Sequence, residues 1–184
     1  MAKKNKTSGK NIVGCGRCGT CCVDPIIPLN DDDVRSITKH TGIPAIELTR
    51  FYSFDDMEWP DDSDDWIHLR YGRRLMVLKK LRGRCMFLED NGCAIYKHRP
   101  RVCRIFPYDF QFTEDLSEMD VEMQSRIKGC VASGAKNPEK NKALVQNGRL
   151  LFKADQKYRK KLERWNRENP RGTVREFLDW MGLK

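Results

Sequence analysis

The segment Cys15-Gly-Arg-Cys18-Gly-Thr-Cys21-Cys22 places four cysteines within eight residues. Thiolates at a two-residue spacing can converge on one soft metal ion, because the glycines between them let the backbone curl until several sulfur atoms face inward. A second set of cysteines, Cys85, Cys93 and Cys103, follows about 70 residues later. We therefore expect the chain to fold around metal.

The cysteine content favours metal binding over a disulfide scaffold. Eight cysteines in 184 residues is about 4%, well below the roughly 8–10% of a short secreted disulfide protein. Residues 11–25 contain no apolar run of the length that a signal peptide needs, and no stretch approaches the ~18–20 apolar residues of a membrane span. We expect a reducing cytoplasm, where clustered cysteines bind metal or act in redox chemistry.

Charge is segregated along the chain, whose formal net charge is +9. Residues 24–65 carry three basic and twelve acidic residues, whereas residues 66–110 carry eleven basic and three acidic ones. Residues 136–184 carry fourteen basic and six acidic residues. A basic run of this kind is usually the outward face of an amphipathic helix. We expect nucleic acid to bind weakly and without specificity at most, and no membrane to be a partner.

Two short helices are predicted after the first cysteines. Asn30 is expected to cap a helix whose first turn holds three aspartates, which suit the positive end of the helix dipole, and Gly42 is expected to end it. Residues 44–52 are predicted to form a second short helix that packs on the first. Together they predict a helical hairpin over the metal region.

Short strands are predicted around the second set of cysteines. Residues 67–69 and 75–78 are apolar runs separated by a Tyr-Gly-Arg turn, and the runs that begin at Cys85 and Cys93 are separated by Asp-Asn-Gly. Asn-Gly between apolar runs is a strong hairpin signal. Three or four antiparallel strands would then put Cys85 and Cys93 on neighbouring strand ends, and Pro100 would open a short helix carrying Cys103.

The C-terminal part is predicted to be helical. Apolar residues recur at close to helical spacing from Leu144 to Trp165, after an N-terminal signal at Asn137-Pro138. Gly148 costs about 1 kcal/mol relative to alanine within a helix, so we expect a break near it. Thr173-Val-Arg-Glu176 is a capping box that predicts one more short helix.

These elements predict an α+β fold, in which a small antiparallel sheet and short helices surround a cysteine-ligated metal site with a C-terminal helical extension. The length favours one domain with additions. We expect a basic flexible tail at residues 1–11, a cysteine-cluster metal-binding domain at residues 12–135, and a basic helical extension at residues 136–184 that packs on the domain.

Two motifs carry a resemblance to a known family. They are Cys15-x2-Cys18-Gly-x-Cys21-Cys22, and Cys93-Ala-Ile-Tyr-Lys-His-Arg99-Pro-x2-Cys103-Arg104-x-Phe-Pro. In this order they resemble the YkgJ-type cysteine-cluster family, also described as a CxxCxxCC zinc- or iron-chelating domain, over about residues 12–130. The resemblance implies a metal site and defines no reaction.

One branch with a similar cysteine cluster is the flagellin lysine-N-methylases, in which the cluster is associated with an iron–sulfur centre and with methylation of protein lysines. A nucleotide-like cofactor would call for a glycine-rich strand–turn–helix motif, and the sequence contains none. We therefore assign the methyltransferase activity to no residue of this sequence.

Ligand spacing leaves two metal centres open. Zinc takes four ligands and usually two Cys-x2-Cys pairs, but the second set here is Cys-x7-Cys-x9-Cys. The first three cysteines have the spacing of a [4Fe–4S] site, whose fourth ligand is remote, so an iron–sulfur cluster is favoured over zinc. We expect both sets to share one site. The candidate metal ligands are Cys15, Cys18, Cys21, Cys22, Cys85, Cys93, Cys103 and Cys130.

Some candidates have less direct roles. Adjacent cysteines rarely point at one small ion, so Cys22 is expected to serve a second site or to support the first from behind. Arg99 and Arg104 lie in the second motif and are candidate cofactor-binding residues, because guanidinium groups offset the negative charge of a thiolate-rich centre. His98 is a candidate minor ligand.

Two functions follow from these features. The first is a metal-binding protein whose thiolate centre, an iron–sulfur cluster in preference, acts in redox chemistry or protein modification together with a protein partner or protein substrate. The second is a structural zinc module that presents a basic surface to nucleic acid or to an acidic protein. The sequence identifies no catalytic residue, so it leaves open whether the protein is an enzyme.

Overall fold

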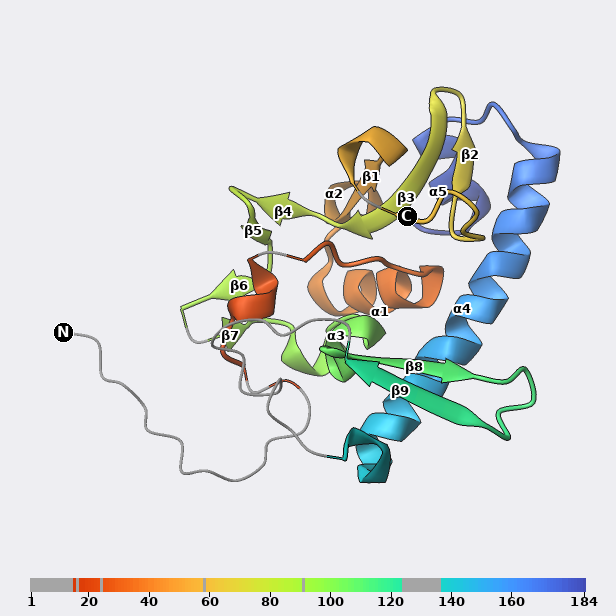
Figure 1. The fold of residues 1–184 in the computed structure, drawn as a ribbon. Coiled ribbons are helices and arrows are strands. Elements are labelled where there is room, and N and C mark those ends of the chain that lie inside the picture. Colours follow the sequence, from red (N-terminus) through yellow and green to blue (C-terminus); the bar gives the residue numbers. More distant parts are fainter. Residues whose placement is uncertain (1–14, 16, 24, 58, 91, 124–136) are drawn as a thin grey trace.

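The computed structural model describes residue 15 and residues 17–23, 25–57, 59–90, 92–123 and 137–184 (Figure 1). These residues form a mixed α+β fold with small antiparallel sheets and C-terminal helices, as the sequence predicts. In chain order the elements are η1 (Thr20–Cys22), α1 (Asp31–Thr41), α2 (Ala45–Leu48), β1 (Thr49–Tyr52), η2 (Phe54–Asp56), β2 (Ile67–Leu69), β3 (Gly72–Leu78), β4 (Lys80–Leu81), β5 (Arg84–Cys85), β6 (Leu88–Glu89), β7 (Gly92–Cys93), η3 (Tyr96–His98), α3 (Arg101–Ile105), β8 (Tyr108–Phe112), β9 (Met119–Met123), η5 (Pro138–Lys140), α4 (Lys142–Glu168) and α5 (Val174–Trp180).

Helix α1 begins and ends as predicted. The Asn30 side chain accepts a hydrogen bond of 2.9 Å from the backbone N–H of Asp33, which caps the helix. Gly42 follows the last turn with φ 73°, a left-handed conformation that glycine adopts without steric cost. The inward side chains Val34 and Ile37 are fully buried, so α1 lies at the centre of the core.

The predicted second helix is wrong in its second half. Only α2 is helical, and Phe51 and Tyr52 lie in strand β1, where they pair with Met76 and Leu75 of β3. Strand β3 is the middle strand of an antiparallel sheet with the order β1-β3-β2. A run of Thr-Arg-Phe-Tyr suits a pleated, half-buried surface, and pairing with β3 satisfies its backbone better than one more helical turn would.

The cysteines of the second set lie on small ribbons. Strand β5 pairs with β4, so that Cys85 faces Lys80, and β7 pairs with β6, so that Cys93 faces Leu88. The prediction that Cys85 and Cys93 occupy neighbouring strand ends is therefore wrong, because each belongs to its own two-stranded hairpin. The predicted short helix after Pro100 is confirmed as α3, which carries Cys103.

Helix α4 is longer and more regular than predicted. It runs without a break through Gly148, and it begins at Lys142, where the Asn141 side chain accepts a hydrogen bond of 2.9 Å from the N–H of Leu144. Asn137 and Pro138 lead into the short turn η5 instead. The predicted break is wrong because tertiary packing around Gly148 outweighs the low helix propensity of glycine.

A hairpin of β8 and β9, which is not among the elements predicted from the sequence, packs on α4. A Cβ atom at Gly148 would lie 2.8 Å from Cγ of Phe110 in β8, so the strand lies directly against the helix backbone at this position. In Figure 1, α4 runs along one side of the molecule, past β2 toward one end and past β8 and β9 toward the other.

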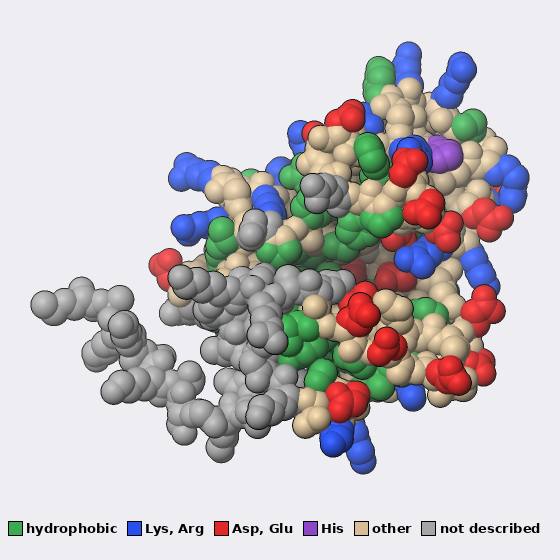
Figure 2. All heavy atoms as spheres, in the orientation of Figure 1, with side chains coloured by type: hydrophobic (Ala, Val, Ile, Leu, Met, Phe, Trp, Pro, Cys, Tyr) green, Lys and Arg blue, Asp and Glu red, His purple; other side chains and the backbone are tan. Residues whose placement is uncertain are grey.

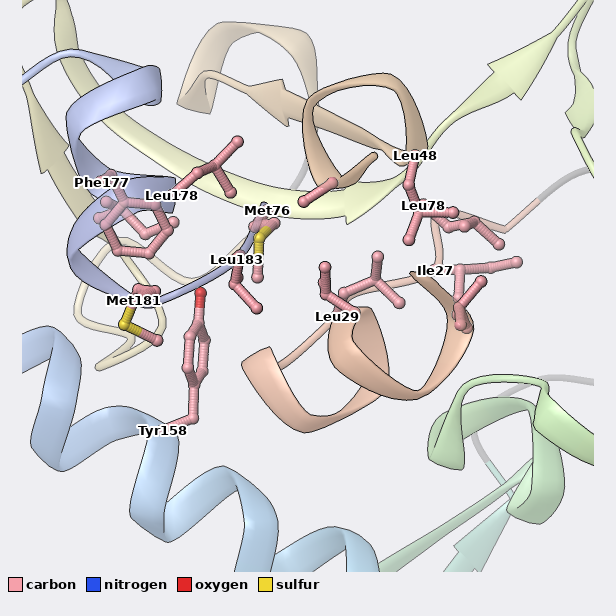
Figure 3. Packing of buried hydrophobic residues seen from close by; sticks show 14 of the residues in the cluster. Ile27, Leu29, Leu48, Met76, Leu78, Tyr158, Phe177, Leu178, Met181 and Leu183 are labelled. Atoms are coloured by element: carbon pink, nitrogen blue, oxygen red, sulfur yellow. The ribbon is translucent and has the colours of Figure 1, made fainter. Parts of the chain in front are cut away.

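One continuous core joins the two halves of the chain (Figure 3). Ile27 and Leu29 precede α1 and are buried in the same cluster as Trp165 of α4 and Phe177 of α5. The rings of Trp165 and Phe177 meet edge to face with centroids 5.3 Å apart. The capping box predicted at Thr173 is confirmed and starts α5. The boundary between a metal-binding domain and a C-terminal extension stays a prediction.

None of the helices in the described ranges combines the length and the apolar character needed to cross a lipid bilayer.

Candidate metal centre

Two glycines let the two sets of cysteines approach each other. Gly19, with φ 74°, precedes η1 and turns the chain there. A Cβ atom at this position would lie 3.1 Å from a methyl group of Leu88. Gly92, with φ 111°, would place a Cβ 3.2 Å from the carbonyl oxygen of Arg17. The absence of side chains at these two positions brings the first set of cysteines against the hairpin of β6 and β7.

Tyr96 connects the first set of cysteines to the second. Its hydroxyl donates a hydrogen bond of 2.9 Å to the backbone carbonyl of Cys15. The guanidinium groups of Arg17 and Arg99 each lie 3.8 Å from the centre of the Tyr96 ring. Since both cations stack on one aromatic ring, they are held beside the cysteines in spite of their mutual repulsion.

The cysteines line two cavities. The larger cavity has a volume of about 150 Å³ and the smaller cavity a volume of about 20 Å³. Cys85 lines only the larger cavity and Cys18 only the smaller one. Five cysteines line both, and they are Cys15, Cys21, Cys22, Cys93 and Cys103. The structure thus brings both sets of cysteines to one place, and their role as metal ligands stays a prediction.

All seven cysteines of the described residues are free thiols, whereas Cys130 lies outside the described residues. Across the described ranges, no three Cys, His, Asp or Glu side chains lie in an arrangement that could hold a metal ion. The cysteines line a shared space from both sets. As a donor set they fit zinc or iron, because thiolates are the ligands that these metals take in structural and iron–sulfur sites.

Hydrogen bonds between thiols explain several pKa shifts. The hydrogen bond with Cys22, and then burial, raise the pKa of Cys21 far above its ordinary value. For Cys22, the bond with Cys21 lowers the pKa, but the bond with Cys85 and burial outweigh it and raise the pKa to about 12. The bond with Cys22 lowers the pKa of Cys85. Cys22 therefore bridges Cys21 and Cys85, a position consistent with support from behind or with a second site.

Burial acts on the remaining thiols. It raises the pKa of Cys15 and Cys93, and the positive charge of Arg99 opposes it at both residues. Burial also raises the pKa of Cys103 well above its ordinary value. Without metal these thiols keep their protons at neutral pH, so a metal must displace protons in order to bind.

The two predicted arginines have different positions. Arg99 lines the larger cavity, donates a hydrogen bond to the carbonyl oxygen of Tyr96, and has a buried Nε with no hydrogen-bond partner among the described residues. Arg104 lines neither cavity; its Nε donates to the carbonyl oxygen of Arg99 at 3.2 Å and fixes the backbone there. Arg104 thus contacts the backbone of Arg99, and the cofactor-binding role of both arginines stays a prediction.

His98 does not line either cavity. Its ring stacks on that of His40, with centroids 3.8 Å apart, at the end of α1. Burial, and then the charge of His40, lower the pKa of His98. Tyr96 and Trp59 lie at the site but are not among the site residues predicted from the sequence. The position of Tyr96 inside the second cysteine motif is a signal that could have identified it, whereas Trp59 lines the larger cavity from a loop with no such signal.

Residues 14–131 match the sequence profile of the CxxCxxCC family, described as "Putative zinc- or iron-chelating domain". The chain belongs to this family. An uncharacterized protein of Methanocaldococcus jannaschii is 31% identical to it over 100 residues, which are 53% of this chain and 45% of that protein. The chain thus aligns with less than half of the relative's length. No solved structure matches the chain.

Membership of the CxxCxxCC family makes this a metal-binding protein, of a family described as zinc- or iron-chelating. The two cofactors expected from the cysteine spacing, an iron–sulfur cluster and zinc, both agree with that description. The match includes every cysteine of the chain and the hairpins, turns and helix α3 that carry the described ones.

Proposed function

We propose that the cysteine cluster binds an iron–sulfur centre that serves redox chemistry or protein modification. The observation that carries this proposal is the number of thiols at one place. A single zinc ion takes four ligands, whereas seven cysteines from two distant segments line two cavities that share a wall. A donor set of this size suits a centre with several metal atoms, and Cys15, Cys18 and Cys21 have the spacing of a [4Fe–4S] site.

Arg99 supports a centre of high negative charge. Several thiolates in one half-buried place repel one another, and a cation beside them lowers the cost of deprotonation. The charge of Arg99 acts in this direction on Cys15 and Cys93, and its buried Nε lacks an acceptor among the described residues. We infer that this N–H donates to a sulfur atom of the loaded site, an interaction that raises the reduction potential of thiolate-bound iron.

The partner is proposed to be an acidic protein. The hairpin of β4 and β5 ends at Cys85 and carries the basic residues Lys80, Arg82 and Arg84. Leu81, beside the turn of this hairpin, is 52% exposed. Basic side chains project from this part of the molecule in Figure 2. A basic rim with an exposed apolar residue suits a protein surface that offers carboxylates and an apolar patch.

A structural zinc site is the second candidate. The smaller cavity favours it, because about 20 Å³ is room for one water-sized occupant, and six cysteines line it. In this case four of the six would hold one zinc ion in a closed tetrahedron, and the others would remain thiols. The centre would then stabilise the fold and take no part in electron transfer.

Metal analysis after anaerobic purification tests the proposal. We expect a brown protein that contains iron and acid-labile sulfide, with bound iron near four atoms per chain for a [4Fe–4S] cluster, and that bleaches in air. The control is the same protein exposed to air before analysis, which should lose iron and sulfide together. A colourless protein that holds one zinc ion per chain and survives air would reject the iron–sulfur centre and support the structural site.

A further inference from the structure

An open groove lies apart from the cysteines, where the sheet of β1, β3 and β2 meets the start of α5. Its walls are the three strands, the turn between β2 and β3, and the segment that leads into α5. Figure 1 shows these elements together at the top of the molecule, away from the hairpin of β6 and β7. Among the described residues, none lines both this groove and a cysteine cavity. The groove is thus a feature separate from the metal centre.

Three arginines line this groove, and none of them has a carboxylate partner among the described residues. They are Arg50 on β1, Arg70 after β2 and Arg74 on β3. The ion pairs in the described part of the chain involve other arginines. Because a cleft lined by charges of one sign concentrates their field, an anion in this groove would be stabilised.

Two carboxylates are influenced by the groove arginines, but both are bound elsewhere. Hydrogen bonds from Ser53 lower the pKa of Asp56 most, and the charges of two groove arginines add to the effect. Asp56 accepts these bonds from the N–H and the hydroxyl of Ser53 at 2.8 and 2.6 Å. Glu176 accepts bonds from the N–H and the hydroxyl of Thr173 at 2.7 and 2.8 Å. Since these carboxylates cap η2 and α5, the arginines can bind another anion.

The backbone holds the walls of the groove in place. Nη1 of Arg74 donates a hydrogen bond of 2.8 Å to the carbonyl oxygen of Arg73. The backbone N–H of Arg70 donates a hydrogen bond of 2.8 Å to the carbonyl oxygen of Gly172, which joins the turn to the segment before α5. A guanidinium group has five N–H donors, so Arg74 keeps most of its donors for a ligand.

An exposed aromatic residue lies beside the arginines. Tyr71 lines the groove and is 77% exposed. The Cζ atom of Arg70 lies 5.6 Å from the centre of the Tyr71 ring, within the range of a cation–π interaction. A flat aromatic group of a ligand can therefore stack on this ring while its anionic group contacts the guanidinium groups.

A phosphate monoester suits these arginines better than a carboxylate does. It carries about −1.5 to −2 charges at neutral pH and three strong acceptor oxygens. Guanidinium groups bind phosphate oxygens with pairs of parallel N–H donors, so three of them match a group with several acceptors. The groove measures about 420 Å³, which lies within the range of about 300–1,000 Å³ for small-molecule pockets.

We propose that this groove binds a small phosphate monoester that carries a flat aromatic group. The phosphate contacts Arg50, Arg70 and Arg74, and the aromatic group lies on Tyr71. Guanidinium side chains hold the phosphate, and no glycine-rich loop is required.

Calorimetric titration of the metal-loaded full chain with three probes tests the site. Phenyl phosphate combines the ring with the phosphate, methyl phosphate lacks the ring, and benzoate replaces the phosphate by a carboxylate. We expect phenyl phosphate to bind saturably, about fivefold or more tightly than either other probe, and more weakly as salt is added. Equal affinity for all three probes, or no saturable binding of phenyl phosphate, overturns the proposal.

Substitutions locate the site on the protein. Arg70→Gln and Arg74→Gln each remove a charge-assisted hydrogen bond and should weaken phenyl phosphate binding about tenfold. Tyr71→Ala should reduce the affinity for phenyl phosphate to that for methyl phosphate. Arg175→Gln removes an exposed arginine of α5 outside the groove and should leave the affinity unchanged. Equal weakening by Arg175→Gln would show general attraction to a basic protein and reject the site. Should Arg74→Gln change the circular dichroism spectrum, Arg70→Gln decides.

A phosphotyrosine peptide distinguishes a small ligand from a protein segment. If the peptide and phenyl phosphate bind with similar affinity, the small-molecule assignment is supported. If the peptide binds more than about tenfold more tightly, its further contacts dominate, and the small-molecule assignment is wrong. A finding of zinc in place of iron rejects the proposed function and leaves this test intact, because the groove and the metal centre are separate.

Discussion

The Tyr96 hydroxyl donates a hydrogen bond to the backbone carbonyl of Cys15, and the two residues are separated by 81 positions. This bond fixes the first cysteine of the first set to the turn that follows the hairpin of the second set. It therefore holds the two sets together before any metal arrives, and it lowers the conformational entropy that metal binding must remove.

Tyr96→Phe removes this bond and keeps the aromatic ring between Arg17 and Arg99. We expect the metal-free protein to lose about 1 kcal/mol of unfolding free energy, the usual net worth of one hydrogen bond. We also expect metal affinity to fall several-fold, because Cys15 is then held less firmly. Urea unfolding and competition with a chelator measure the two effects. Tyr71→Phe is the matched control, since the Tyr71 side chain is 77% exposed, and it should change neither.

Cys103→Ser tests whether the two sets of cysteines share one centre. Cys103 lines both cavities together with Cys15, Cys21, Cys22 and Cys93. Since an alcohol is a far poorer ligand than a thiolate for soft metals, bound metal per chain should fall in this variant. Cys18→Ser should also lower it, and elemental analysis measures both.

Val102→Ala is the control for Cys103→Ser, because it alters the neighbouring position of α3 without removing a thiol. Its metal content should match that of the native protein. If Cys18→Ser and Cys103→Ser both keep full metal content and an unchanged circular dichroism spectrum, the shared centre is refuted.

Local chemistry explains which elements the sequence predicts correctly. The cap at Asn30, the end of α1 at Gly42 and the capping box at Thr173 depend on residues close in sequence, and all three are confirmed. The hairpin of β6 and β7 follows from Asn-Gly, a signal that is just as local.

Long-range packing determines the elements that the sequence does not predict. Phe51 and Tyr52 have apolar character that fits a helix or a strand, and only pairing with β3 decides between them. At the site, the cysteine spacing indicates metal, but Trp59 reaches the larger cavity through the tertiary fold, which no local pattern reveals.

Gly148→Ala tests the packing that keeps α4 unbroken. Helix propensity alone predicts a gain of about 1 kcal/mol. However, the new Cβ would lie 2.8 Å from Cγ of Phe110, and relief of such overlap costs about 1–3 kcal/mol. We expect net destabilisation in urea unfolding. Gln146→Ala, at an exposed position of the same helix, should show no loss. A more stable Gly148→Ala variant would mean that the hairpin of β8 and β9 shifts away from α4 at little cost in free energy.

Asp155 gives the unfolding free energy a pH dependence. Burial raises its pKa to about 6, although the side-chain amide of Asn30 donates a hydrogen bond of 2.8 Å to it. The ordinary value is 3.8, so the folded protein binds the proton more tightly than the unfolded chain. This group therefore stabilises the fold at low pH, and that contribution is lost as the pH rises through about 6.

Asp155→Asn should remove this dependence. The variant should gain stability relative to the native protein above about pH 7, and the difference should shrink as the pH falls toward about 4. Urea unfolding at several pH values measures it. Gln156→Ala changes the neighbouring uncharged residue and should give a curve parallel to that of the native protein. A constant offset between Asp155→Asn and the native protein would show that Asp155 does not titrate in this range.

Metal removal should loosen the cysteine region before the C-terminal helix. In the described part of the chain, residues 15–23 and 84–104 hold all the cysteines in turns, two-residue strands and one short helix, so few backbone hydrogen bonds hold them without metal. Helix α4, by contrast, buries Leu162 and Trp165 in the main core. Hydrogen exchange with and without chelator should show that amides near the cysteines lose protection while those of α4 around Trp165 keep it. Equal protection in both forms would show that the metal adds no folding free energy, and simultaneous loss in both regions would show that the whole chain unfolds as one unit when the centre is removed.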